Sequence, residues 1–270
     1  SSSLGENFAG LYELRTRQVY TMTVAAVIPA RMDSSRYPGK PLCDIQGMSM
    51  IEHVYRRTRM SDSVDETYIA TPDEEIRDEA QSFDGSVIMT GSHTRATDRV
   101  AEAAEGLDAD IIVVMQGDEP LVYPDMLDDA IAPVRDEEGV KVTNLAKPIT
   151  DQDEYPDPNN VKVVVDNDSN ALYFSRAPIP HIHAGTYDEA SVYHQVCVIP
   201  FEREFLFKFT SMEETELEQI ESIDMLRLLE NGYEVRLVEN NRETYPVDTP
   251  EDHEKVEQMM NSDRLFEEYK

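Results

Sequence analysis

The chain is organised around the stretch VAAVIPARMDSSRYPGKPL, residues 24–42. Its first part, Val24–Pro29, is an uninterrupted apolar run typical of a buried parallel strand. The part that follows places Arg31, Arg36 and Lys40 in a short turn built around a proline–glycine pair. Backbone N–H groups and cations in such a loop can converge on phosphate groups. The pattern indicates a polyphosphate site; from these residues alone, a surface loop with solvated cations is the alternative.

The composition excludes several classes of function. The 270 residues, 40% of them hydrophobic, can bury a sizeable core as one large or two small domains. Asp and Glu number 55 against 24 Lys and Arg, a formal charge of −31. This charge argues against nucleic-acid binding and against anionic membrane surfaces. No stretch approaches the length of a membrane span, so we expect neither nucleic acid nor membrane as a partner.

The cysteines and the N-terminal segment bear on the cellular compartment. Cys43 and Cys197 lie in apolar contexts and are too few for a disulfide framework. We expect buried free thiols and a cytoplasmic protein. Residues 1–21 lack the apolar core of a signal peptide, and Met22 immediately precedes the first strand. We expect this segment to be a disordered extension or a remnant of cloning.

In the first half of the chain, apolar runs alternate with helical patterns. The predicted strands cover residues 24–29, 67–71, 86–90 and 111–115, and the predicted helices 50–60, 74–83, 97–107 and 125–135. This alternation is typical of βαβ units and a mostly parallel sheet. Ligand loops lie at the carboxyl edge of such sheets, so residues 31–41 and 116–120 can share one site.

The second half is less regular. It predicts paired strands at 161–165 and 171–174, strands at 192–199 and 233–238, and helices at 201–209, 214–229 and 250–260. The pair Asn231-Gly232 is a typical helix C-terminus. One α/β domain with an inserted arm is therefore favoured over two domains.

Two acidic motifs are candidates for a metal site. In QGDEP (116–120), Asp118 can hold Mg²⁺ near phosphates while Gly117 permits close approach, although a capped turn also explains this motif. In VDTPED (247–252), a helix N-cap explains the later residues and leaves Asp248 unassigned. By itself Asp248 is read as structural. Together with Asp118 on a second loop, it makes a suitable Mg²⁺ site.

Other familiar motifs are absent or weak. Lys40 is followed by Pro41, so the basic loop is not a Walker motif, and no G-x-G-x-x-G occurs. His181 and His183 could ligate a metal, but a solvated loop is favoured because no cysteine or third histidine accompanies them. His194 lies within an apolar strand, where a hydrogen-bonded structural histidine is the default.

Five segments, taken in order, resemble the 3-deoxy-manno-octulosonate (Kdo) cytidylyltransferases, also called CMP-Kdo synthetases. They are ARMDSSRYPGKPL (30–42), QGDEP (116–120), DPNNVKVV (157–164), ALYFSRAPIP (171–180) and VDTPED (247–252). The resemblance implies a Rossmann-like α/β nucleotide-diphospho-sugar transferase fold with a mixed, mostly parallel sheet of the seven-stranded type. It implies a single domain over 22–270, with an inserted sugar-binding and dimerisation arm at about 157–212.

The same resemblance implies the reaction. CMP would pass from CTP to the anomeric hydroxyl of a 3-deoxy-2-ulosonic acid sugar, Kdo or a close analogue, with Mg²⁺ as cofactor and pyrophosphate as product. The enzyme would work as a homodimer. A different acid sugar (8-amino-Kdo or sialic-type) or a sugar 1-phosphate is the alternative substrate, and a non-catalytic nucleotide-binding relative is the alternative class.

The resemblance also assigns site residues. The catalytic residues would be Arg31, Lys40, Asp118 and Asp248, the two aspartates binding Mg²⁺. The nucleotide would contact Ala30, Arg31, Ser34, Lys40, Thr71, Thr97, Arg99 and Asp118. The sugar would contact Gln116, Arg176, His194 and Asp224. Arg176 suits a carboxylate because its planar guanidinium binds such groups bidentately.

Several positions depart from the family pattern. The segment that usually reads Ser-Gly-Thr-Glu-Arg is here Arg95-Ala96-Thr97-Asp98-Arg99. Pro72 stands where Asp is typical, Val198 where Tyr is typical, and Asp224 where Glu is typical. The last two changes fall in the implied sugar pocket, so the nucleotide and metal assignment is better supported than the identity of the sugar.

The acidic composition generates a first prediction. Most of the cations are arginines, and an acidic, lysine-poor surface suits a high-salt cytoplasm because screening suppresses self-repulsion. We expect the melting temperature to rise as KCl increases from roughly 0.1 to 1 M, over which the Debye length falls from about 10 to 3 Å. Thermal melts across this range check it, and a melting temperature indifferent to salt contradicts it.

Overall fold

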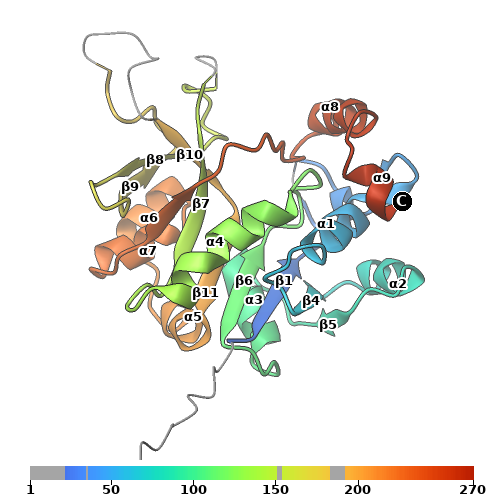
Figure 1. Ribbon diagram of the computed structural model, residues 1–270, viewed down its shortest axis with the longest axis horizontal. Coiled ribbons are helices and arrows are strands. Elements are labelled where there is room, and N and C mark those ends of the chain that lie inside the picture. The colour runs from blue at the N-terminus through green and yellow to red at the C-terminus, as the bar shows by residue number, and fades with distance from the viewer. Residues whose placement is uncertain (1–21, 35, 151–153, 183–191) are drawn as a thin grey trace, which may run out of the picture.

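Five strands form the central sheet of the computed structural model, which describes residues 22–34, 36–150, 154–182 and 192–270 (Figure 1). β1 (Val24–Pro29) lies between β4 (Glu66–Thr71) and β6 (Ile111–Met115) and is parallel to both. β5 (Val87–Met89) extends the parallel order beyond β4, and β11 (Val198–Glu202) pairs antiparallel with β6. The four strands expected in the first half are confirmed.

A second sheet continues from the first. Its strands, in spatial order, are β12 (Arg236–Glu239), β7 (Thr143–Pro148), β10 (Tyr193–Val196), β8 (Lys162–Val165) and β9 (Ala171–Ser175). A single bridge between Val142 and Phe201 joins the start of β7 to β11. Across this bridge the strands run β5-β4-β1-β6-β11-β7-β12, which is a mixed, mostly parallel order of seven. The expected α/β fold is therefore confirmed.

Alternate residues of the central strands face two different cores. In β1, Ala25 and Val27 pack with α3 (Ala96–Ala104), α5 (Arg203–Thr210) and α7 (Met225–Glu230). Val24, Ala26 and Ile28 pack with helices on the opposite face, namely α1 (Met50–Thr58), α2 (Glu74–Ser82) and α4 (Pro124–Asp136) (Figure 1). Burial on both faces explains the uninterrupted apolar sequence of this strand. No helix in the described ranges has the length and apolar character of a membrane span.

The strand predicted at 192–199 is wrong in its continuity. The chain changes sheets at Cys197, so that β10 pairs with β7 while β11 pairs with β6. The Cys197 carbonyl accepts a hydrogen bond from the backbone N–H of Gln116, at 3.1 Å, where the chain crosses to β6. The helix predicted at 201–209 begins two residues later than predicted, at Arg203, because β11 continues through Glu202.

The helix predicted at 214–229 is also wrong, because it is two helices. α6 (Glu216–Glu221) ends at Ser222, whose φ of 54° lies in the left-handed region, and α7 begins at Met225. Tertiary contacts of the intervening residues hold this break. The predicted strand at 233–238 begins later, at Arg236, and β7 was not predicted.

The C-terminal helices are held on α1 by buried polar groups. α8 (Pro250–Met260) and α9 (Phe266–Tyr269) pack beside α1 and the hairpin of β2 (Asp44–Ile45) and β3 (Met48–Ser49) (Figure 1). Arg57, fully buried, forms an ion pair with Asp263 and donates from Nε to the Tyr269 hydroxyl at 2.8 Å. His53 bonds the same hydroxyl through Nδ1, at 2.7 Å. These contacts fix the segment that carries Asp248.

The buried ion pair predicts a large effect on stability. Asp263→Asn leaves the Arg57 guanidinium buried without a counter-charge, so we expect the free energy of unfolding to fall by about 3–5 kcal/mol. Urea unfolding measures this change. Asp78→Asn is the matched control: its ion pair with Arg77 lies on the surface, and we expect its unfolding curve to match the wild type. Equal curves for both variants contradict the prediction.

His53 predicts a dependence of stability on pH. Burial, opposed by the Ile45 carbonyl and aided by Arg57, lowers the pKa of His53 from 6.5 to about 4. Between these values the unfolded chain binds a proton that the folded chain does not, so stability falls as pH falls from about 6.5 to 4. We expect His53→Gln to lose less stability than the wild type between pH 7 and pH 5 in urea unfolding. Identical losses contradict this role.

Candidate active site

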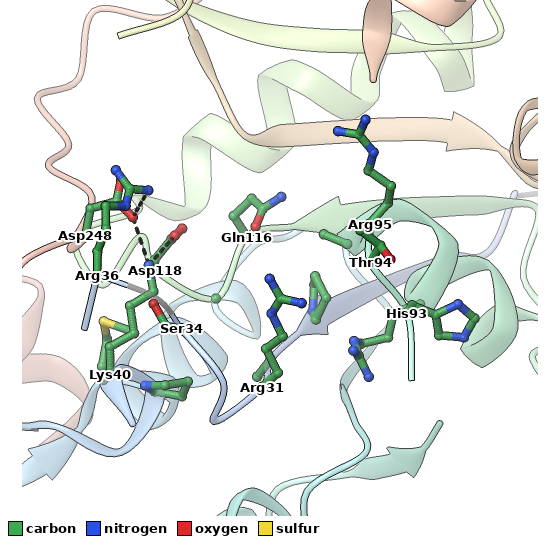
Figure 2. A pocket seen from close by; sticks show the side chains of 17 residues that line it. Arg31, Ser34, Arg36, Lys40, His93, Thr94, Arg95, Gln116, Asp118 and Asp248 are labelled. Atoms are coloured by element: carbon green, nitrogen blue, oxygen red, sulfur yellow. Dashed lines mark hydrogen bonds and ion pairs between the residues drawn. The ribbon is translucent and has the colours of Figure 1, made fainter. Parts of the chain in front are cut away.

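A cleft of about 300 Å³ lies at the carboxyl ends of β1 and β6 (Figure 2). Its lining residues are Pro29, Ala30, Arg31, Ser34, Arg36, Lys40, Pro41, Met50, His93, Thr94, Arg95, Ala96, Arg99, Gln116, Gly117, Asp118 and Asp248. The structure thus brings the basic loop and the QGDEP loop into one site, as the parallel sheet predicts. Asp248, more than a hundred residues further along the chain, joins them.

One end of the cleft is an ion-pair cluster centred on Lys40 (Figure 2). Its Nζ donates to Asp118 Oδ2 at 2.9 Å, to Asp248 Oδ1 at 3.0 Å and to the Val247 carbonyl at 2.9 Å. These contacts use all three N–H bonds of the ammonium group. Arg36 Nη2 lies 2.9 Å from the same Asp248 oxygen. Burial alone would lower the pKa of Lys40, but the two carboxylates raise it above its usual value, so Lys40 is a permanent cation.

Two glycines permit this geometry. Gly39, with φ 74°, adopts the left-handed conformation that turns the chain into the short 3-10 helix η1 (Lys40–Leu42). Gly117 lies against the end of β1: a Cβ there would be 2.9 Å from the Pro29 carbonyl oxygen. A side chain at 117 would therefore push the Asp118 loop away from the basic loop.

The C-terminal segment enters the cleft through the start of α8. Thr249 Oγ1 accepts from the Asp252 N–H at 3.2 Å, and Asp252 Oδ2 accepts from the Thr249 N–H at 2.9 Å. The helix N-cap predicted at this motif is confirmed, and it takes the form of a capping box. The Val247 N–H donates to the Asp118 carbonyl at 2.9 Å, so the two acidic loops are joined by their backbones. Asp248 lies between these contacts, with its carboxylate in the cleft.

The other end of the cleft comes from the connection between β5 and α3. Figure 2 shows His93, Thr94 and Arg95 on the far side of Gln116 and Arg31 from the Lys40 cluster. Arg99 is also there, nearly buried, with Nη1 donating to Thr90 Oγ1 at 2.8 Å. Burial, then the nearby Arg31, lower its pKa.

Five of the residues assigned from the resemblance do not line this cleft: Thr71, Thr97, Arg176, His194 and Asp224. Thr71 is fully buried, and its Oγ1 accepts from the Asp73 N–H. Thr97 is 2% exposed and donates from Oγ1 to Asp224 Oδ2 at 2.6 Å. The side chains of Thr71 and Thr97 therefore contact protein.

Arg176 and His194 lie in the second sheet or at its end. Arg176 donates to three backbone carbonyls, those of Glu221 (2.8 Å), Pro158 (3.0 Å) and Ser222 (3.4 Å). Its guanidinium thereby joins two chain segments. His194 is 8% exposed; its Nε2 is buried and has no hydrogen-bond partner among the described residues. Burial, reinforced by two lysines, lowers its pKa to about 4, so this ring is neutral at physiological pH.

Four lining residues with polar or charged side chains were not predicted as site residues: Arg36, His93, Thr94 and Arg95. Arg36 could have been found, because it is one of three cations in the basic loop. Arg95 stood out only as an added charge. His93 and Thr94 carry no local signal, since the path of the connection before α3 places them.

Among the residues that line this cleft, Asp118 and Asp248 carry the carboxylates that could bind a metal ion. In the described part of the chain, no group of three or more His, Cys, Asp or Glu side chains is arranged to hold a metal. Cys43 and Cys197 are free thiols whose pKa values are raised by burial, so they are poor ligands. Of the two histidines considered for a metal, His183 lies outside the described residues. A divalent metal held by Asp118 and Asp248 would need further oxygen ligands to complete its coordination.

The comparisons with known proteins agree with this geometry. A family model described as "Cytidylyltransferase" matches residues 25–258. The chain therefore belongs to the cytidylyltransferase family. It is a nucleotidyltransferase, and the resemblance to the Kdo cytidylyltransferases is confirmed.

Two curated relatives show how far the likeness extends. The 3-deoxy-manno-octulosonate cytidylyltransferase of Syntrophotalea carbinolica is 43% identical over 244 residues, which are 87% of this chain and 98% of the relative. The enzyme of the same name from Pelobacter propionicus is 44% identical over 241 residues, 86% of this chain and 94% of that one.

Solved structures agree. CMP:2-keto-3-deoxy-manno-octonic acid synthetase complexed with CTP superposes with a TM-score of 0.83 at 38% identity, over 88% of this chain and 98% of that one. A 4-diphosphocytidyl-2C-methyl-D-erythritol synthase from Anaerococcus prevotii, 16% identical, has a TM-score of 0.60 over 89% of this chain and 97% of its own. This second likeness shows the shared fold.

Proposed function

We propose that this cytidylyltransferase transfers CMP from CTP to the anomeric hydroxyl of a 3-deoxy-2-ulosonic acid sugar, Kdo or a close analogue, and releases pyrophosphate. The observation that carries the proposal is the meeting of Lys40, Asp118 and Asp248 in one cleft. It is supported by relatives named 3-deoxy-manno-octulosonate cytidylyltransferase, which are 43–44% identical to this chain over nearly their whole length.

The basic loop supplies the phosphate half of the proposed site. Arg31, Arg36 and Lys40 all line the cleft, and CTP carries its negative charge on the triphosphate. In a chain of net charge −31, these cations oppose the repulsion that the rest of the protein exerts on a polyanion. Binding of the phosphates by Lys40 requires the ammonium group to exchange at least one of its three present acceptors for a phosphate oxygen.

The two aspartates fit Mg²⁺ by their chemistry. Both carboxylates approach one cation, Lys40, to 3.0 Å or closer, and both are about a quarter exposed, so each can offer an oxygen to the cleft. Protein Mg²⁺ sites commonly use one or two carboxylates and complete the shell with substrate phosphates and water. Bound there, Mg²⁺ would supply positive charge against the triphosphate.

The reaction requires positioning and charge rather than a covalent enzyme intermediate. The anomeric oxygen forms a bond to the α-phosphorus of CTP, the bond from that phosphorus to pyrophosphate breaks, and the hydroxyl proton passes to solvent water. Negative charge grows on the departing pyrophosphate, so a cation beside it lowers the barrier more than it strengthens ground-state binding. Lys40, kept protonated by its neighbours, suits this task.

We place the acceptor sugar beyond Gln116, toward Asp224, Arg176 and His194. Gln116 lines the middle of the cleft, and Asp224 is hydrogen-bonded to Thr97 beside the cleft.

The arm at about 157–212 would join two protomers of the enzyme, which we expect to work in the cytoplasm. Leu172, 60% exposed on the edge strand β9, supports an interface there.

A substrate panel tests the proposed function. Pyrophosphate release from CTP is followed with Kdo, 8-amino-Kdo and a sialic-type acid, each with and without Mg²⁺. We expect release with Kdo or its amino analogue and none without a divalent cation. Turnover with none of the acid sugars overturns the proposal, and turnover only with a sugar 1-phosphate identifies the alternative.

The metal role of Asp118 is tested by mutation. We expect Asp118→Ala to lower kcat by about 10²- to 10⁴-fold, because the loss of a metal carboxylate removes several kcal/mol of transition-state stabilisation. A thermal melt checks that the variant is folded. Asp78→Ala, an exposed change on α2, serves as the control and should match wild-type kinetics. An Asp118→Ala enzyme with wild-type turnover refutes the role.

A further inference from the structure

Arg95 lines the cleft, but its guanidinium is bound to α6. Its Nε lies 3.4 Å from Glu214 Oε1, and its Nη2 lies 3.7 Å from Glu218 Oε1. The Arg95 side chain is only 18% exposed. As the residue just before α3, it ties the start of that helix to a separate segment more than a hundred residues later in the chain.

Glu218 is a fixed anchor for this contact. It is fully buried and receives two hydrogen bonds from Arg227, at 2.7 Å from Nε and 2.6 Å from Nη2. It also accepts from the Thr215 N–H at 3.3 Å. Because Glu218 cannot rotate freely, Arg95 holds α6 at a defined distance from the cleft.

A second contact ties the same helix start to α7. Thr97, in the first turn of α3, donates to Asp224, the residue before α7, at 2.6 Å. The two ties therefore act on either side of the break at Ser222, within the α6–α7 segment of residues 214–230. At this break the backbone hydrogen bonding of the helices is interrupted. The side-chain ties before and after Ser222 compensate for that break.

The far side of the same segment is bonded to β9. Glu221 accepts from Ser175 Oγ at 2.7 Å and from the Arg176 N–H at 2.9 Å, while Arg176 Nε donates back to the Glu221 carbonyl at 2.8 Å. The α6–α7 segment is thus held between the nucleotide cleft and the arm. Arg95 and Asp224 are therefore contacts of one segment, with Asp224 bonded to the same helix start that Arg95 precedes.

We propose that Arg95 and Thr97 are positioning residues that hold Asp224 at the acceptor side of the cleft, so that affinity for the acid sugar depends on them. This inference rests on the proposed function, because it takes Asp224 to face the sugar. It differs from a direct role in which Arg95 binds a substrate anion. In a direct role, Glu214 competes with the substrate, and its removal strengthens binding.

Steady-state kinetics separate the two roles. For Arg95→Ser we expect KM for the sugar to rise by about threefold to tenfold, with KM for CTP and kcat within about twofold of wild type. Glu214→Gln should raise KM for the sugar in the same direction, and the double variant should be no worse than Arg95→Ser. A lower KM in Glu214→Gln, or a rise in KM for CTP alone, overturns the proposal. Arg77→Ser, on α2, is the control.

Substitutions at Thr97 provide an independent test. Thr97→Val removes the bond to Asp224 at nearly constant volume, and Thr97→Ser retains the hydroxyl. We expect the valine variant to raise KM for the sugar and the serine variant to restore it to within about twofold of wild type. Equal kinetics in the two variants contradict the tie.

Amide hydrogen exchange tests, without any substrate, whether Arg95 and Thr97 hold the α6–α7 segment in place; we call these two contacts the clamp. We expect residues 216–230 to exchange faster in Arg95→Ser and in Thr97→Val, while residues 250–260 of α8 stay as protected as in wild type. Unchanged exchange in 216–230 overturns the clamp whatever the kinetics show. A wild-type enzyme inactive toward every acid sugar overturns the proposed function, and exchange then decides the clamp alone.

Discussion

The contact of one ammonium group with two carboxylates is the interaction on which the cleft depends. Lys40 joins Asp118, 78 residues away, to Asp248, 208 residues away, through bonds of 2.9 and 3.0 Å. Arg36 adds a second cation, so the four charged groups nearly cancel. Loss of either carboxylate leaves the partly buried Lys40 ammonium group with one counter-charge in place of two, which is destabilising. The cluster is therefore both structural and a ready source of ligands for phosphates and Mg²⁺.

The charge of the whole chain makes this local neutrality significant. Around a protein of net charge −31, an approaching triphosphate is repelled over about a Debye length, and salt shortens that distance. Arg31, Arg36 and Lys40 line the cleft and attract the triphosphate at short range, and the attraction of Lys40 is screened least because its side chain is only 14% exposed. An acidic surface is compatible with an anionic substrate because the repulsion by the surface and the attraction by the cleft cations act over different distances.

The sequence predicts those parts of the fold in which local pattern and tertiary environment agree. β1 and β6 were predicted because strands buried on both faces must be continuously apolar. β7 was missed because its sequence, TNLAKP, contains residues that are uncommon in strands, and its burial depends on neighbours contributed by distant segments. The breaks at Cys197 and Ser222 have no local signal, since a backbone contact holds the first and tertiary packing the second.

The same distinction applies to the cleft. The basic loop and the QGDEP loop could be placed together from the parallel sheet, because both follow strands that run in one direction. Asp248 was paired with Asp118 from its residue type and from the family resemblance, not from the sheet, because its position depends on the buried Arg57–Asp263 pair that docks the C-terminal helices. Arg176 was assigned to a substrate, yet three backbone carbonyls already engage its guanidinium. A residue type suited to a ligand is equally suited to the backbone.

The two ends of the cleft are constrained to different degrees. At the Lys40 end, each side chain holds another in place and also carries the charge that a triphosphate requires, so a substitution there disturbs structure and chemistry together. At the Arg95 end, the contacts run to α6 and α7, and the charges there serve packing. A substitution at this end can change the packing of α6 and α7 while leaving the Lys40 cluster intact. The departures from the family pattern at Arg95, Ala96 and Asp224 lie at this end, so the contacts that distinguish this chain from its family pattern are separate from those that hold the Lys40 cluster.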